Sequence, residues 1–375
     1  MPTIDDIARL AQVAPSTVSK VLNNRPHVSR ATRARVEQVI AATGFVPSQR
    51  ARRLVTGRSC ILGLLIPYTS DQLFADPHLL EIMRGIEAEA TEREYNLLLT
   101  TARTTLDAAS ALVRLLRSDV IDGAIVVETH DVQPFAETLQ QRPAPWVVIG
   151  YASPGVVPAV HADDFSGALA ATRHLLGLGH RRLGVISSLP RPFALDERLR
   201  GIRTALGEAG QHLDEHLIVT GDFSPASGER AAHCLLERPD PPTAIFALND
   251  RMAAGALRAA ASRGLRVPED LSVVGFDDIA LASLLTPPLT TVRQSGYSLG
   301  RAAAALFFQC LDGQTPEAPA IIPTELVVRD SSGPAPQDRR PDRAASPSDV
   351  NRAEPGLPRS SARSGAARTY GRRRG

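Results

Sequence analysis

Apolar residues recur every three or four positions along the first 45 residues of the chain, which is the period of amphipathic helices. Thr3 and Asp6 have the spacing of a capping box at the start of a first helix. Pro15 suits the first turn of a second helix, and Ser29 and Gly44 suit the two ends of a third. The apolar positions of these helices are Ile4, Ile7, Ala8, Ala11, Val18, Val21, Leu22, Val36, Val39 and Ile40. Three short helices joined by tight turns predict a helix-turn-helix module.

The pattern changes from residue 61 onward, where short apolar runs alternate with helical stretches of roughly 12 to 18 residues. These runs are ILGLLI (61–66), NLLL (96–99), GAIVV (123–127), WVVIG (146–150), LGVIS (183–187), LIVTG (217–221), AIFAL (244–248) and LSVVGF (271–276). The alternation predicts an α/β fold of parallel sheets with helices on both faces. About nine or ten strands are more than one such sheet uses, so we expect two similar lobes with a ligand-binding cleft at the carboxyl ends of the strands.

Charge is distributed unevenly, although the whole chain has a net charge of only +2. Residues 1–60 hold ten basic and three acidic side chains, a net charge of +7, and residues 331–375 hold ten basic and four acidic ones, a net charge of +6. The middle of the chain therefore carries −11. A cationic front end predicts a polyanionic partner, and the acidic middle indicates a different task. Beyond Asp330 the apolar periodicity gives way to Pro, Ser, Ala and Arg, so we expect a disordered tail.

Composition narrows the class of protein further. A hydrophobic content of 43% is ample for a globular core. No apolar run approaches the roughly 18 to 20 residues that a membrane helix needs, and the first residues do not resemble a signal peptide. We therefore expect a cytoplasmic protein without a membrane segment. Cys60, Cys234 and Cys310 are far apart and lack metal-ligand spacing, which predicts reduced thiols and no zinc site.

Several longer segments follow one another in a specific order. They are TIDDIARLAQVAPSTVSKVLN, VSRATRARVEQVIAATGFVPSQRARRL, GHRRLGVIS, TAIFALND, VPEDLSVVGFDD and PPLTTVRQ. Through them residues 1–330 resemble the lactose/galactose repressor (LacI/GalR) family of transcriptional regulators. The resemblance implies a DNA-binding headpiece, a hinge helix and a two-lobed core shaped like a periplasmic sugar-binding protein. It also implies a homodimer or tetramer that binds near-palindromic, double-stranded operator DNA.

The resemblance and the pattern together predict the domain boundaries. We expect a helix-turn-helix domain at 1–46, a hinge helix at 47–59, a two-lobed effector-binding and dimerisation core at 60–330, and the tail at 331–375. The N-lobe should comprise about 60–159 and 290–319. The C-lobe should comprise about 160–289 and 320–330.

A recognition helix must enter the major groove, so its leading side chains must be small or polar enough to approach base edges and phosphates. By resemblance the base-reading residues are Pro15, Ser16 and Lys20, and those that contact phosphate or support the helix are Thr17, Ser19 and Asn23. Lys20, the single lysine of the chain, can donate to guanine, although many relatives have arginine at this position. Ala14 stands at the expected N-cap, where many relatives have serine, and a missing cap oxygen weakens a helix by roughly 0.5–2 kcal/mol. A solvated helical domain without DNA affinity is the plainer alternative.

The hinge segment PSQRARRLV (47–55) is basic and includes Arg52. It carries Leu54 where the family inserts a leucine into the minor groove, which opens a base step and kinks the duplex. Ser48 replaces the asparagine that usually follows this proline. Because the arginines repel one another and the helix is short, we expect the hinge to fold only on the operator.

The core offers polar side chains at the ends of its predicted strands. By resemblance the effector contacts are Arg198, Asn249 and Asp277, with Gln294 and Tyr68 as further candidates. Carboxylate, guanidinium and amide groups suit polyhydroxylated ligands, since each hydroxyl both donates and accepts hydrogen bonds. Asp250 is either an effector contact or the cap of a helix beginning at Arg251, and the cap is the better interpretation. The same two interpretations apply to Asp278. Asp163 either lies near the lobe junction or caps a helix that begins around Phe165.

Enzyme and metal interpretations find little support in the sequence. The segment GLGHRRLG (177–184) differs from a dinucleotide-binding fingerprint in glycine spacing and leads into a strand, whereas the fingerprint leaves one. The adjacent Asp277 and Asp278 do not form an acid–base pair that faces one substrate. Trp146 opens a core strand, His180 precedes one, and His174 does not join His180 in a metal site. We therefore predict no catalytic residues, metal or cofactor.

The combined expectation is a cytoplasmic DNA-binding regulator whose operator affinity is controlled by a small polar ligand such as a sugar. Repression is the expected mode of regulation. A cytoplasmic sugar-binding protein or a Rossmann-type enzyme with an incidental helical headpiece is the alternative.

Overall fold

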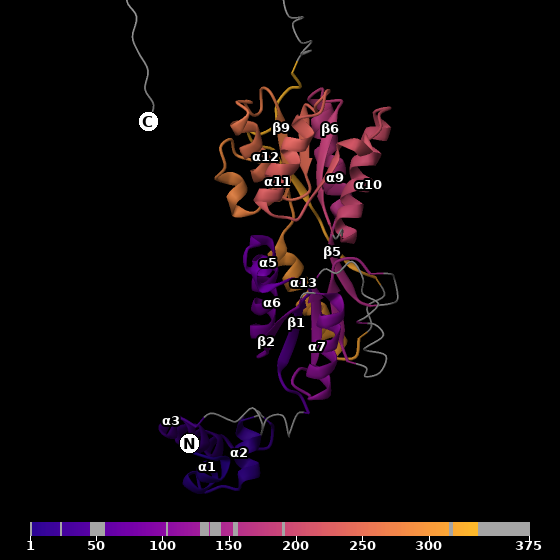
Figure 1. The fold of residues 1–375 in the computed structure, drawn as a ribbon. Coiled ribbons are helices and arrows are strands. Elements are labelled where there is room, and N and C mark those ends of the chain that lie inside the picture. Colours follow the sequence, from indigo (N-terminus) through magenta and orange to yellow (C-terminus); the bar gives the residue numbers. More distant parts are fainter. Residues whose placement is uncertain are drawn as a thin grey trace, which may run out of the picture. The chain divides into compact units, whose positions relative to one another are not determined.

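The computed structural model describes residues 2–22, 25–45, 57–102, 104–127, 135, 144–152, 157–189, 192–314 and 318–336. At the N-terminal end lie α1 (Ile4–Leu10), α2 (Pro15–Leu22) and α3 (Arg30–Thr43), as the apolar pattern predicts (Figure 1). Their shared core is centred on Ile7, Val18 and Val36, one from each helix, all fully buried. The predicted capping box is present, and Gly44 ends α3 in the left-handed conformation at φ +61°.

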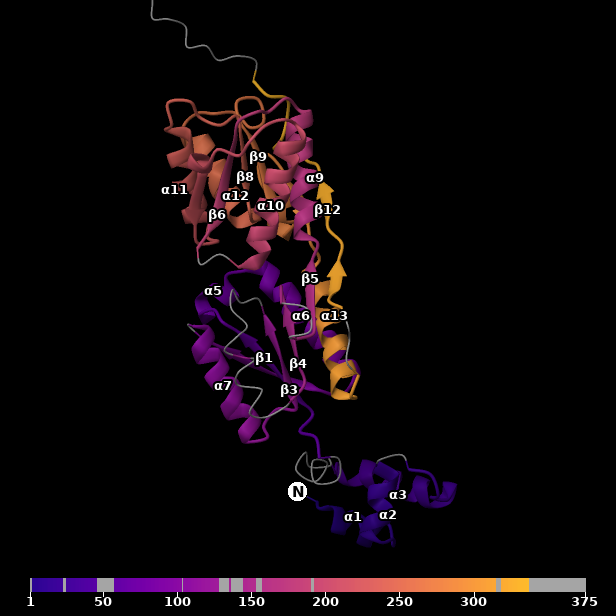
Figure 2. The same cartoon turned by 90° about the vertical axis from the view of Figure 1, so that its right-hand side faces the viewer.

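The first lobe is built on a parallel six-stranded sheet of order β11-β5-β4-β3-β1-β2. The strands are β1 (Ile61–Ile66), β2 (Asn96–Thr101), β3 (Gly123–Val127), β4 (Trp146–Ile149), β5 (Ala159–Ala162) and β11 (Ala320–Ile322). Helices α6 (Pro77–Glu92) and α13 (Gly296–Leu311) pack on one face and α7 (Thr105–Arg117) on the other (Figure 2). The short α5 (Ser70–Phe74) follows β1.

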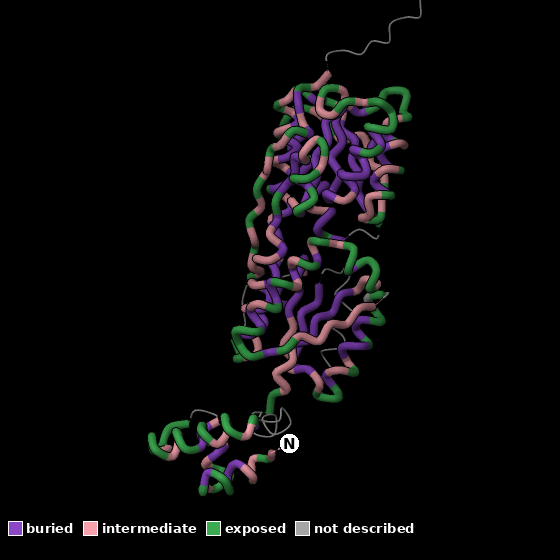
Figure 3. The backbone as a smooth tube through the Cα atoms, turned by 90° about the vertical axis from the view of Figure 1, so that its left-hand side faces the viewer, coloured by how far each residue is buried: buried purple, intermediate pink, exposed green. Residues whose placement is uncertain are grey.

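The second lobe repeats this plan with the order β12-β10-β9-β8-β6-β7. Its strands are β6 (Leu183–Ser188), β7 (Ile218–Gly221), β8 (Ala244–Ala247), β9 (Ser272–Asp277), β10 (Thr290–Arg293) and the antiparallel β12 (Glu325–Val327). One face is covered by α9 (Asp164–Gly177) and α10 (Phe193–Glu208), and the other by α11 (Pro225–Leu236) and α12 (Asp250–Ser262). Two 3₁₀ helices, η1 (Glu215–Leu217) and η2 (Ala280–Ser283), precede β7 and follow β9. Figure 3 shows the buried residues concentrated in the strands of both sheets.

The lobe boundaries differ by a few residues from those expected. The strand β5 pairs within the first sheet, although we expected the C-lobe to begin at about residue 160. Likewise β10 belongs to the second sheet and β11 to the first, so the expected boundaries at 290 and 320 each fall one strand too early. We placed each boundary near the start of a strand, but the chain passes to the other lobe only after that strand has paired within its sheet. These strands are short, and β5 and β10 also contain polar side chains such as His161, Thr291 and Arg293, so they show no clear apolar run.

The C-terminal boundary also needs correction, because residues 331–336 are integrated into the second lobe. The Val273 amide donates to the Ser331 carbonyl at 2.8 Å, and the Ala335 amide donates to the Leu178 carbonyl at 2.8 Å. His180, fully buried, contacts the Gly333 carbonyl at 3.0 Å as well as the Thr243 and Ser272 hydroxyls. Residues 331–336, here called the C-terminal strap, therefore extend the core past Asp330. The rest of the expected tail, 337–375, lies outside the described residues.

Candidate functional site

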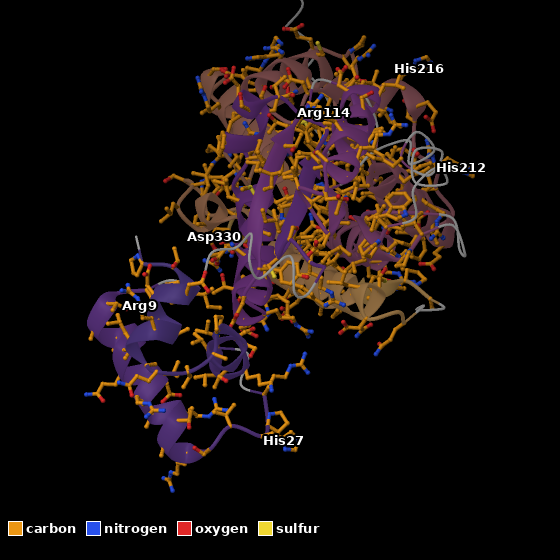
Figure 4. The ribbon with its side chains drawn as sticks, turned by 90° about the horizontal axis from the view of Figure 1, so that it is seen from below. Arg9, His27, Arg114, His212, His216 and Asp330 are labelled. Carbon is orange, nitrogen blue, oxygen red and sulfur yellow. The ribbon has the colours of Figure 1, made fainter. Side chains whose placement is uncertain are left out.

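Helix α2 presents its polar side to solvent. Pro15, Ser16 and Lys20 are exposed, whereas Val18 and Val21 are buried against α1 and α3. The remaining described residues with expected DNA contacts, Thr17 and Ser19, are half-buried at the edge of this surface. The surface therefore has the small and polar side chains that a helix in the major groove requires. Figure 4 shows Arg9 and His27, two further exposed side chains of the same module.

The start of α2 is as expected from the sequence, and its end has a partner that the sequence did not indicate. At the start, the Ala14 carbonyl accepts the Thr17 amide at 2.8 Å, but alanine supplies no side-chain acceptor. At the end, the Arg33 guanidinium from α3 donates to the Val21 carbonyl at 3.4 Å and the Arg25 carbonyl at 3.1 Å. A cation at a helix C-terminus also interacts favourably with the helix dipole. Arg33 thus supports the end of α2, a role that no sequence motif indicated.

Three expected DNA contacts, Asn23, Arg52 and Leu54, lie outside the described residues, as does most of the predicted hinge helix at 47–59. They stay predictions.

A cavity of about 350 Å³ lies between the two lobes. All five expected effector residues line it: Tyr68, Arg198, Asn249, Asp277 and Gln294. They arrive from different elements, namely the end of β1, the middle of α10, the end of β8, the end of β9 and the segment after β10. The carboxyl ends of the parallel strands thus converge on one site, as expected for this class of fold.

Arg198 is the centre of a buried polar network on the second lobe. Its Nε donates to Asp164 Oδ1 at 2.7 Å, and its Nη1 lies 3.9 Å from Asp277 Oδ1. The guanidinium also stacks on the Phe276 ring at 3.6 Å. Burial raises the pKa of the Asp164 carboxyl above its usual range, while the adjacent Arg198 opposes this shift. Sequence reasoning missed Asp164, although a signal existed: in the pair Asp163-Asp164 only one carboxylate can cap the helix.

Asp163 is that cap. Its Oδ1 accepts the Ser166 amide at 3.1 Å at the start of α9, so the capping alternative for this residue is confirmed. The helix begins one residue earlier than expected.

Asp277 lies at the last position of β9 in a backbone conformation that L-residues rarely adopt, with φ at +117°. Gln294 Nε2 donates to its Oδ1 at 2.6 Å, which ties the crossover after β10 to the cleft. Burial raises the pKa of the Asp277 carboxyl, and the positive charge of Arg198 acts in the opposite direction. Strained backbone at the end of a strand is typical of binding sites.

The capping role expected for Asp250 needs correction. Asn249, not Asp250, caps α12, because its Oδ1 accepts the Met252 amide at 2.8 Å. Its Nδ2 donates to the Phe223 carbonyl at 3.3 Å. Asp250 is the first residue of the helix, and its carboxylate accepts hydrogen bonds from the Ile279 amide and the Thr291 hydroxyl. Burial, together with the nearby negative charge of Asp277, raises the pKa of Asp250 well above its usual range.

Two further residues of the cavity form an ion pair between the lobes. Arg251 Nη1, from α12, lies 3.5 Å from Asp76 Oδ2, at the start of α6. The same Asp76 carboxylate caps α6 through Oδ1, which accepts the His78 amide at 3.0 Å. Sequence reasoning did not single out either residue, because their partnership depends on the approach of the two lobes. Asp278, by contrast, contacts Arg293 at 2.8 Å and Arg329 at 2.7 Å and has a structural role.

The remaining aromatic and histidine expectations concern the core. Trp146 opens β4 and packs beside Phe135 at a ring-centroid distance of 6.3 Å, partly buried. His174 contacts the Ser332 hydroxyl at 2.9 Å, and neither it nor His180 faces a metal site. Within the described ranges, no group of three or more His, Cys, Asp or Glu side chains is placed to hold a metal ion.

Comparison with known proteins decides the family. Residues 3–48 match the model for bacterial regulatory proteins of the lacI family, and residues 172–332 match that for a periplasmic binding protein-like domain. The HTH-type transcriptional regulator CelR of Thermobifida fusca is 36% identical over 336 residues, covering 88% of this chain and 98% of CelR. The chain belongs to the lacI family.

Other members support the same assignment across both parts of the chain. The HTH-type transcriptional repressor CytR of Escherichia coli K12 is 34% identical over 334 residues, covering 88% of this chain and 96% of CytR. The solved CelR–cellobiose complex has a TM-score of 0.69 at 35% identity and covers 88% of this chain and all of that one. The Lac repressor dimer bound to operator and the anti-inducer ONPF has a TM-score of 0.80 at 27% identity, covering 88% and 99%.

The lacI-family membership confirms the fold and the function predicted from the sequence. The protein is a DNA-binding transcriptional regulator with an effector-binding core, and its close relatives are regulators and not enzymes. Among the described helices, none is long and apolar enough to cross a membrane.

Proposed function

We propose that this regulator binds a neutral saccharide in the cavity between the lobes, through Tyr68, Arg198, Asn249, Asp277 and Gln294, and thereby changes its affinity for operator DNA. The observation that carries this proposal is the charge balance of the cavity wall. Within the described part of the chain, the arginines that line the cavity are Arg198 and Arg251, and both have carboxylate partners: Asp164 and Asp277 for Arg198, and Asp76 for Arg251. An anionic ligand would have to compete with these carboxylates, of which Asp164 and Asp277 are buried.

The polar and apolar parts of the wall suit a sugar. Carboxylate and amide groups of Asp277, Asn249 and Gln294 offer acceptors and donors for hydroxyl groups. The rings of Tyr68 and Phe223 line the same cavity and provide apolar surface for the C–H faces of a sugar. The volume of about 350 Å³ lies within the range of small-molecule sites. The cellobiose complex of CelR supports the same ligand class.

The mode of DNA binding is the second part of the proposal. The protein acts in the cytoplasm as a homodimer or tetramer, and two copies of α2 read the halves of a near-palindromic operator through Pro15, Ser16 and Lys20. Thr17, Ser19 and Asn23 contact phosphate or support the helix, Arg52 contacts the DNA, and Leu54 enters the minor groove. The exposed polar side of α2 and the operator complex of the Lac repressor support this part.

A thermal-shift series tests the ligand class. Cellobiose, glucose, galactose and ribose should be compared with glucose 6-phosphate and gluconate at equal concentrations. At least one neutral compound should raise the unfolding midpoint and change the gel shift of a DNA fragment from upstream of the gene, since ligand binding stabilises the folded state. Stabilisation by the anions alone would overturn the proposal.

A further inference from the structure

The segment between the DNA-binding module and the core, Arg58 to Cys60, is held by one carboxylate of the first lobe. We call these three residues the hinge base. Asp122 Oδ1 accepts the Ser59 amide at 2.6 Å, and its Oδ2 accepts the Cys60 amide at 3.0 Å. The Tyr95 hydroxyl donates to the same Oδ2 at 2.9 Å. Cys60 has a φ of +56°, an uncommon conformation that persists only where its surroundings fix it.

The last turns of α13 contact the hinge base by two independent routes. Arg58 Nη2 donates to the Leu311 carbonyl at 3.3 Å and to Asp312 Oδ1 at 3.4 Å, at the C-terminus of the helix. The ring of Tyr95 packs edge-to-face on Phe308, with centroids 5.0 Å apart. Tyr95 therefore joins two contacts in one side chain: its ring touches α13, and its hydroxyl orients the carboxylate that holds the hinge base.

The opposite end of α13 begins at the effector cleft. Gln294, which donates to Asp277 Oδ1 at 2.6 Å, stands two residues before the first residue of the helix, Gly296. The helix has 16 residues and therefore spans about 24 Å at 1.5 Å per residue. Figure 2 shows it running beside α6 along the first lobe. One straight element thus has the cleft at its N-terminus and the hinge base at its C-terminus.

Close packing makes α13 and α6 a rigid pair. A Cβ atom added at Gly85 would lie 2.1 Å from the Tyr297 carbonyl oxygen, and one added at Gly300 would lie 2.1 Å from the Ile82 carbonyl oxygen. The two backbones therefore touch at both glycines. Because α6 also begins at the cleft, at the Asp76–Arg251 ion pair, a change between the lobes displaces the pair as one body.

We propose that Tyr95 is a positioning residue that transmits the state of the Gln294–Asp277 contact through α13 to the hinge base, and so to the DNA-binding module. A ligand that takes over the hydrogen bonds of Gln294 or Asp277 shifts the start of α13. The Tyr95–Asp122 contact converts this shift into a change in the direction in which residue 58 leaves the core. The inference rests on the proposed location of the effector site, but not on the chemical class of the effector.

A double-mutant cycle tests this transmission without any ligand. The full-length protein first selects a duplex from a random-sequence DNA library, and fluorescence anisotropy then gives the Kd of each variant for that duplex. Gln294→Ala breaks the cleft contact at the start of α13 and should change the operator Kd by about fivefold or more, the usual size of an allosteric coupling. In the Tyr95→Phe background, which keeps the ring on Phe308 and removes only the hydroxyl, the same change should fall below about twofold.

Tyr297→Phe is the matched control, since Tyr297 lies in the first turn of α13 with its ring under Arg84, away from the hinge base. Gln294→Ala should keep its full effect in this background. Asp122→Asn is a second test variant and should reduce the effect as Tyr95→Phe does. An equal effect of Gln294→Ala in all backgrounds, or no effect in the otherwise wild-type protein, would overturn the proposal. Because no ligand enters the cycle, failure of the saccharide proposal leaves this result interpretable.

Discussion

At the residue scale, the sequence predicted which positions line the cleft better than what each side chain does there. Asn249 and Asp250 are adjacent acceptors at the start of a helix, and either could cap it on chemical grounds alone. The decision comes from Thr291 and the Ile279 amide, which approach Asp250 from segments 29 or more residues away. Long-range partners of this kind leave no local pattern. The same limit explains why Asp164, Asp76 and Arg251 were not singled out.

Arg198 should contribute strongly to stability as well as to ligand binding. Arg198→Ala leaves the buried Asp164 carboxylate without its cation, and breaking one side of a buried pair commonly costs about 3–5 kcal/mol. Urea unfolding of the variant should show a loss of this order together with loss of the ligand response. Arg200→Ala, two positions along α10 at an exposed ion pair with Glu197, is the control and should cost less than about 1 kcal/mol. Similar losses of unfolding free energy in both variants would contradict a special contribution of Arg198 through its buried carboxylate partners.

Lys20 should distinguish the operator from random DNA. Lys20→Ala is expected to weaken operator binding by about 1–3 kcal/mol and to weaken binding to random duplex much less. Arg35→Ala removes the same charge from an exposed position on α3 and should weaken both alike. Anisotropy titrations on both duplexes at one salt concentration provide the comparison. Equal losses on both DNAs for Lys20→Ala would remove it from base reading.

His180 should make the attachment of the C-terminal strap sensitive to pH. Burial lowers its pKa below the ordinary 6.5, so the neutral ring belongs to the folded state. Its contribution to stability is therefore fully present above about pH 6.5 and is lost as the pH falls through the lowered pKa of the folded protein. Urea midpoints measured from neutral to mildly acidic pH should decline, and less steeply in His180→Asn. If the urea midpoint of His180→Asn fell with pH as steeply as that of the wild-type protein, His180 would not be the source of the pH dependence.

At the element scale, helices with a clear apolar period and strands that coincide with an apolar run were predictable, and strands without such a run were not. The eight apolar runs all correspond to strands of the two sheets. The strands without such a run are β5, β10, β11 and β12. Each is short and, except for β11, contains a polar or charged side chain, such as His161 in β5 or Glu325 in β12, so its identity comes from the neighbours with which it pairs. The sheet in which each of these strands pairs also determines the lobe to which it belongs, and this explains why the observed lobe boundaries differ from the expected ones.

The recognition helix should gain stability from a single cap. Ala14→Ser adds a side-chain acceptor at the position that lacks one and should stabilise α2 by about 0.5–1 kcal/mol. Amide hydrogen exchange at Ser16 and Thr17 should slow accordingly. Ala31→Ser, at an exposed position inside the first turn of α3 where Ser29 already provides the cap, should produce no such slowing. Faster exchange at α2 in Ala14→Ser would contradict the expected cap.

At the scale of the whole molecule, the two-lobed plan and the family followed from the order of the motifs, because strand–helix alternation and motif sequence are properties of the entire chain. The cleft followed in outline, since the carboxyl ends of parallel strands face it. The C-terminal end of the core could not be predicted from the sequence. Ser331 to Pro336 contain no apolar period, and their burial depends on His180, Ser272 and Val273 elsewhere in the chain.

Two truncations should locate the functional end of the core. Removal of residues 337–375 should leave the unfolding midpoint and the ligand response unchanged. Removal of 331–375 deletes the strap. The buried His180 and Ser272 then lose their contacts with Gly333, and the Val273 amide loses its acceptor, the Ser331 carbonyl. Stability should fall by several kcal/mol, at roughly 1–3 kcal/mol per unsatisfied group. Equal stability of the two truncated proteins would restore the earlier boundary at Asp330.

The chain crosses between its lobes three times, after β5, after β10 and after β11. Neither lobe is therefore encoded by one continuous stretch of gene. A recombination event that exchanges a single lobe with a relative would need several simultaneous junctions, each within a strand–crossover segment. The DNA-binding module, by contrast, is continuous and precedes the core, so one junction suffices to exchange it. One junction thus exchanges operator preference against the whole two-lobed core, whereas exchange of one lobe alone would separate residues that together line the cleft.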